Sequence, residues 1–146
     1  MLWARSLVLI AVFSSGHNAG FRTAWAGDEA PARLTCKFET GNSGSYEGGL
    51  FKSQPSSALE FEISDINLEA QAAKISTSGK VTGTLRIVRA LNANHYLEVA
   101  NEGFLNLTTV YDLDPSIKAY PAVHSRHFGL FGQPVFAQYT GLCTPM

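Results

Sequence analysis

The sequence predicts an all-β protein, a small antiparallel β-barrel of about eight strands closed by one disulfide. Apolar and polar residues alternate over short segments separated by turn residues, which is typical of antiparallel sheets. Cys36 and Cys143, the only two cysteines, lie 107 positions apart (143 − 36), in the first predicted strand and at the end of the last. A barrel brings these strands together by closure, whereas a β-sandwich, the alternative, does so only in some topologies.

The N-terminus has the layout of a signal peptide. Arg5 supplies a short basic region, and the uninterrupted apolar run Leu7–Phe13 follows it. The small residues around Trp25 predict cleavage after Ala26, with Ala19 as an earlier alternative. A retained membrane anchor is disfavoured, because this run is far shorter than the roughly 20 residues that span a bilayer. The predicted divisions are a signal peptide (1–26), a flexible N-terminal segment (27–33) and a single β domain (34–146).

The charge of the predicted mature chain argues against two classes of partner. Arg5 and Arg22 lie in the leader, which leaves 9 of the 11 basic residues beside all 12 acidic ones. We expect no nucleic-acid partner and no electrostatic attachment to a membrane, because both require a basic surface. The expected product is a soluble periplasmic or secreted protein with no stable membrane insertion after signal cleavage.

Export favours a disulfide between Cys36 and Cys143, because oxidising compartments preserve such bonds. Two separate buried thiols or a metal pair are the alternatives. Two cysteines without a neighbouring His or Cys make a poor zinc site, and the spacing is not that of a C-x-x-C redox motif. In the chain-entropy model, closing so long a loop removes about 4–5 kcal/mol of unfolded-state freedom.

The first half of the domain predicts three or four strands. Leu34–Thr40 forms the first, and the polar run Gly41–Ser45 is expected to be a loop. Tyr46–Lys52 is a second strand weakened by two glycines, and the Pro55 region is a turn. Residues 59–64 alternate strictly, and Ile66 and Leu68 continue on the other parity, which predicts a bulge near Asp65. Residues 69–76 favour a strand over a short helix because strands are predicted on both sides.

The second half alternates more regularly. Ser78-Gly79 opens a strong strand, and turns are expected at Asn92–Asn94 and at Asn101–Gly103. The first of these strands alternates over residues 81–87, and further strands are predicted over residues 95–99, 104–111, 120–128 and 134–142, with a loop at 129–132.

The densest polar and aromatic cluster lies near the C-terminus. In a strand, His124 and Arg126 share a face, and a buried arginine must be paired or must reach a ligand anion. We therefore predict that His124, Arg126, Tyr139 and Gln138 line a pocket for a small anionic or polar ligand. The alternatives are a surface arginine or an internal ion pair, for which the candidate partners are Glu98 and Glu62.

A metal or catalytic site is the competing hypothesis for this cluster. It would use His124, Arg126 and His127, with His95 as a further imidazole from a neighbouring strand. In a strand, however, the two histidines of the cluster point to opposite faces, and no serine is framed by a nucleophile motif. We therefore expect no catalytic residue, no metal and no cofactor.

The C-terminal third resembles a group of small exported bacterial β-proteins of unknown function. The resemblance rests on residues 108–111 (Thr-Thr-Val-Tyr), 122–127 (Ala-Val-His-Ser-Arg-His) and 138–143 (Gln-Tyr-x-Gly-x-Cys). It implies export and a cysteine-closed β-domain, and it implies no activity. The predicted function is an exported, non-catalytic β-domain that binds a small molecule or an envelope protein partner.

Overall fold

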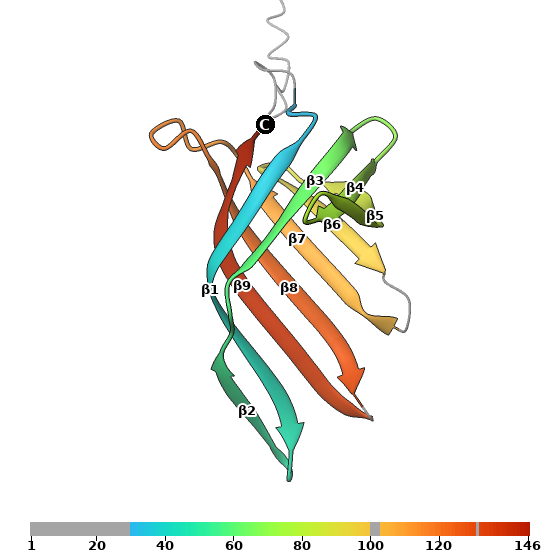
Figure 1. Cartoon of the computed structure of the whole chain (residues 1–146), viewed down its shortest axis with the longest axis vertical. Coiled ribbons are helices and arrows are strands. Elements are labelled where there is room, and N and C mark those ends of the chain that lie inside the picture. The colour runs from blue at the N-terminus through green and yellow to red at the C-terminus, as the bar shows by residue number, and fades with distance from the viewer. Residues whose placement is uncertain (1–29, 100–102, 131) are drawn as a thin grey trace, which may run out of the picture.

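The computed structural model describes residues 30–99, 103–130 and 132–146, and these residues contain nine β-strands and no helix. The signal peptide predicted for residues 1–26 lies outside the described residues, as does most of the turn predicted at 101–103. Figure 1 shows the strands as one strongly curved sheet. The strands are β1 (Leu34–Glu47), β2 (Leu50–Pro55), β3 (Leu59–Asn67), β4 (Ala72–Thr77), β5 (Lys80–Arg89), β6 (Ala93–Val99), β7 (Leu105–Tyr111), β8 (Tyr120–Leu130) and β9 (Gln133–Pro145).

Eight of these strands close a barrel, which confirms the predicted fold. Consecutive strands from β3 to β9 pair antiparallel, and β1 pairs with both β3 and β9. β2 is an extra strand that pairs with the second half of β1 only. The hairpin of β1 and β2 therefore extends beyond the point where β3 leaves β1, as the lower part of Figure 1 shows.

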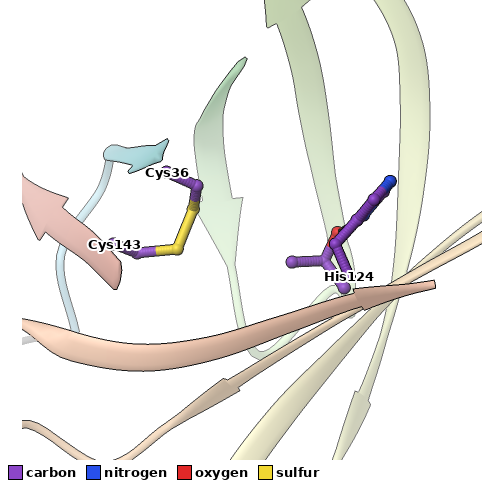
Figure 2. Close-up of a disulfide and its surroundings, with 4 residues drawn as sticks. Cys36, His124 and Cys143 are labelled. Atoms are coloured by element: carbon purple, nitrogen blue, oxygen red, sulfur yellow. Dashed lines mark hydrogen bonds between the residues drawn. A yellow bond between two sulfur atoms is a disulfide. The ribbon is translucent and has the colours of Figure 1, made fainter. Parts of the chain in front are cut away.

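The predicted disulfide is present and lies across the β1–β9 seam. Cys36 and Cys143 are direct register partners, with their Cα atoms 4.0 Å apart. The bond therefore joins the strand pair that closes the barrel, and both cysteines are fully buried (Figure 2). Burial of both sulfurs keeps the crosslink within the packed interior rather than on the surface.

Along each strand, side chains that face the barrel interior alternate with side chains that face outward, as strand geometry requires. We call the end with the disulfide the terminal end, and the end with the β1–β2 and β8–β9 hairpins the hairpin end. On β7 and β8 the buried residues Val110, Tyr120 and Ala122 lie on the terminal side of His124, so this half of the barrel is packed. The core also contains Leu34, Cys36, Phe38, Phe61, Ile63, Ala73, Ile75, Leu85, Ile87, Tyr96 and Cys143.

The bulge predicted near Asp65 is confirmed. The β3–β4 register shifts between Ser64 and Asn67, and Asp65 has a positive φ of 52°. The Asp65 side chain also binds Lys74 on β4 at 2.7 Å. Because of the bulge, the apolar side chains after Asp65 can alternate on the other parity and still face the same side of the sheet as those before it.

The predicted loop at Gly41–Ser45 is wrong, because β1 runs through it without interruption to Glu47. The chain turns later, at Gly48-Gly49, where both glycines adopt the positive φ that a tight hairpin requires. Gly41 and Gly44 lie within this strand, and they are glycine because the rings of Tyr139 and Phe136 occupy the space where their Cβ atoms would lie. Glycine here indicates close packing of an aromatic ring rather than a loop.

Two further predicted boundaries differ from the structure. The Pro55 region is the end of β2 rather than a turn. Proline has no backbone N–H to donate, and an edge strand tolerates this because not every N–H of such a strand is needed for pairing. Asn94 is a buried β6 residue rather than part of a turn. Residues 30–33 form no strand, yet the carbonyls of Ala32 and Arg33 accept hydrogen bonds from the amides of Ile66 and Met146.

Candidate functional site

Across β8, β9 and β1, register partners form rungs of three residues, and three consecutive rungs lead toward the hairpin end. The chemical type of the side chains in the barrel interior differs from one rung to the next. The first rung is aromatic, the second combines a cation with two small side chains, and the third is mainly apolar. Because alternate residues of a strand share a face, all three rungs face inward. In order they are His124–Tyr139–Gly41, Arg126–Ala137–Ser43 and Phe128–Val135–Ser45.

His124 ends the packed half of the barrel. Its side chain is 1% exposed, and its ring lies 5.1 Å from the ring of Phe61, 5.7 Å from Phe38 and 6.0 Å from Tyr139. Burial among these rings, together with the smaller effect of the nearby charge of Arg126, lowers the pKa of His124 to about 4. His124 is therefore neutral at physiological pH.

The hydrogen bonds of His124 fix its tautomer. Arg126 Nε lies 3.2 Å from His124 Nε2, and an arginine can only donate. Nε2 is therefore the unprotonated nitrogen, so Nδ1 carries the hydrogen and donates to Thr108 Oγ1 at 2.8 Å. Figure 2 shows the side chain of His124, a residue of β8, in the same view as the disulfide. The neutral ring is thus held from both sides, and it orients the guanidinium.

Arg126 is half-buried and has no carboxylate within 4.0 Å among the described residues. Neither candidate ion-pair partner from the sequence reaches it. Glu98 instead accepts a hydrogen bond from Asn106 at 2.7 Å, and Glu62 lies on the opposite face of β3 from the buried Phe61 and Ile63. In the described part of the chain, the guanidinium has only a neutral imidazole as side-chain hydrogen-bond partner.

A cleft of about 500 Å³ opens beside Arg126. Small side chains create it, because Ala137 lies next to the arginine on its own rung, Ser43 lies beyond Ala137, and both leave space there. The β2–β3 connection forms its other side with residues 56–58. The volume lies within the range of about 300–1,000 Å³ that is usual for small-molecule sites.

The structure brings together three of the four predicted ligand-binding residues. Arg126 and Tyr139 line the cleft, and His124 lies beneath it and binds Arg126. Gln138 does not join them, because it is exposed on the outer face of β9, where it lines a separate shallow hollow with Phe136. Adjacent strand residues face opposite sides, so Gln138 and Tyr139 belong to different surfaces.

The histidines of the competing metal hypothesis do not converge. His127 is exposed on the face of β8 opposite His124, and His95 contacts Thr109 at 2.9 Å on the outer face. The described residues contain no group of three or more His, Cys, Asp or Glu side chains placed to hold a metal ion. Among the same residues, no helix is long and apolar enough to cross a membrane.

Sequence reasoning missed the residues that shape the cleft, namely Ser43, Val135 and Ala137. The β8–β9 hairpin register was the signal that could have found two of them. Once the turn near Gly132 is fixed, Arg126 must lie opposite Ala137 and Phe128 opposite Val135. Ser43 could not be found this way, because it lay in the segment expected to be a loop.

Comparisons with known proteins add no further constraint. No protein-family model matches this chain, and no curated protein or solved structure matches it either.

Proposed function

We propose that this chain is an exported, non-catalytic binding protein whose barrel takes a small anionic ligand on Arg126 at the hairpin end. The single observation that supports the proposal most strongly is the half-buried guanidinium, which faces a cleft and lacks a carboxylate among the described residues. Withdrawing a charge from water is costly unless a counter-charge approaches it. A ligand anion would supply that counter-charge.

The disulfide supports the export part of the proposal. A buried bond between Cys36 and Cys143 is consistent with an oxidising compartment. The leader-like N-terminus and the resemblance to small exported bacterial β-proteins favour the periplasm or the extracellular space. Either location would expose the cleft to small molecules of the envelope or the medium.

Native mass spectrometry of protein purified from its own cells tests the proposal. We expect the wild-type protein to carry a small acid, and Arg126→Gln to lose it, because a neutral amide cannot compensate an anion. The matched control is Arg86→Gln, which removes the same charge from an exposed position on β5. Equal occupancy in both variants, or a neutral co-purified molecule, would contradict the proposal.

An envelope protein partner is the second candidate, and the β1–β2 hairpin favours it. Tyr46, Phe51 and Phe136 form a chain of aromatic contacts on its outer face, and Leu50 and Phe51 are 68% and 65% exposed. A photo-crosslinking residue at Phe51 should capture a distinct envelope protein in living cells. The control position is the exposed Val81 on β5. The same adducts at both positions would show that the hairpin is not specific.

A further inference from the structure

Arg126 presents a defined set of donors to the cleft. Its Nε hydrogen is directed to His124 Nε2, so the hydrogens on its two Nη atoms remain for a ligand. Because Thr108 holds the other side of the imidazole, His124 cannot turn away without losing a buried hydrogen bond. The two Nη atoms of the guanidinium are therefore positioned to donate hydrogen bonds to two oxygens of one ligand.

The charge of the site sets the charge of the ligand. Arg126 is the only cationic side chain that lines the cleft in the described part of the chain. Lys52, on the neighbouring hairpin, already faces Glu47 at 3.4 Å. A single guanidinium compensates one negative charge, so a dianionic phosphate would keep a charge without a partner, whereas a carboxylate would not.

The walls of the cleft set the character of the rest of the ligand. On one side, Phe128, Val135 and Tyr139 present apolar surface, and Phe104 stacks on Phe128 with ring centroids 4.7 Å apart. The strands β1 and β2 contribute hydroxyl and amide groups to the lining, those of Ser43 and Gln54. A flat apolar body would contact the apolar side chains, and the polar groups of Ser43 and Gln54 would remain within the cleft.

We propose that the ligand class is a small monocarboxylic acid with an apolar, ring-sized body. This inference rests on the proposed function, because it names what the Arg126 cleft binds. The carboxylate lies on the two Nη atoms of Arg126, and the body lies along the Phe128–Val135 side of β8 and β9. A ring-sized acid fits a cleft of about 500 Å³ that stays open to solvent.

Titrations followed by two-dimensional NMR test this class with acetate, benzoate, 3-phenylpropionate and inorganic phosphate. We expect the two ring-bearing acids to shift the amide signals of β8 and β9 and to bind at least tenfold more tightly than acetate and phosphate. Arg126→Gln should weaken benzoate at least tenfold, and Arg86→Gln should leave its affinity unchanged. Val135→Ser, which makes the apolar wall polar, should reduce the advantage of benzoate over acetate.

The possible outcomes separate this inference from the proposed function. If acetate or phosphate binds as tightly as benzoate and binding still depends on Arg126, the acid class is wrong and the anion site stands. If no probe gives an Arg126-dependent shift, both are wrong. Each variant is first compared with the wild type by circular dichroism and thermal unfolding, and Arg126→Lys serves as a charge-conserving second variant if Arg126→Gln does not fold.

Discussion

His124 connects the packed core to the open cleft. The residue contacts three aromatic rings on one side and orients a guanidinium on the other. Its neutrality is essential to both roles, because a protonated imidazole would be buried and would lie beside a positive charge. The same arrangement predicts how the stability of the protein depends on pH.

The free energy of unfolding should fall as the pH decreases from about 6.5 toward 4. The folded protein holds the pKa of His124 at about 4, below the ordinary value of 6.5, so the unfolded chain binds an additional proton in this window. The contribution is fully present above pH 6.5, and about 3 kcal/mol of it is lost by pH 4. Urea unfolding at several pH values measures the slope.

The control for this pH effect is His124→Gln. Glutamine keeps an acceptor for Arg126 and cannot be protonated in this range. Its unfolding free energy should therefore change less between pH 6.5 and 4 than that of the wild type. Equal slopes in the two proteins would show that other groups cause the pH dependence.

At the scale of elements, the β1–β9 seam allows no side chain at Gly141. A Cβ atom there would collide with the backbone of Lys37 and Phe38, at the bulge where the β1–β9 register shifts. We expect Gly141→Ala to lower the free energy of unfolding by about 2 kcal/mol or more, because overpacking against backbone cannot relax. Chemical denaturation provides the measurement.

Gly129→Ala is the matched control for the seam. Gly129 lies near the C-terminal end of β8, away from the β1–β9 seam, and a Cβ atom there would meet nothing within 4 Å. We expect this variant to have unchanged or slightly increased stability, because alanine restricts the unfolded chain more than glycine does. A seam variant no less stable than this control would mean that β1 and β9 do not pack as described.

Segments with strict alternation could be predicted from the sequence, whereas the part of β1 that contains Gly41 and Gly44 could not. The Asp65 bulge was predicted because a parity shift has only one simple cause in a strand. Local sequence predicts a loop at Gly41 and Gly44, because the aromatic rings that require glycine there lie on β9, more than 90 residues away in the sequence. The inward pairing of His124 and Arg126 was available from local alternation, whereas the cleft depended on the register of β1.

At the scale of the whole molecule, the disulfide joins the first and last strands of the closed barrel. Replacing both Cys36 and Cys143 by alanine should lower the free energy of unfolding by roughly 4–5 kcal/mol in the chain-entropy model. Urea unfolding of the oxidised wild type and the double variant provides the comparison. A difference below about 1 kcal/mol would contradict a structural role for the bond.

The most direct test of the account is a crystal structure of the oxidised protein grown with benzoate. We expect the carboxylate within hydrogen-bond distance of both Nη atoms of Arg126, with Nε still on His124 and the ring against Val135. A structure in which Arg126 pairs with a carboxylate of the protein itself, with no benzoate in the cleft, would contradict the account.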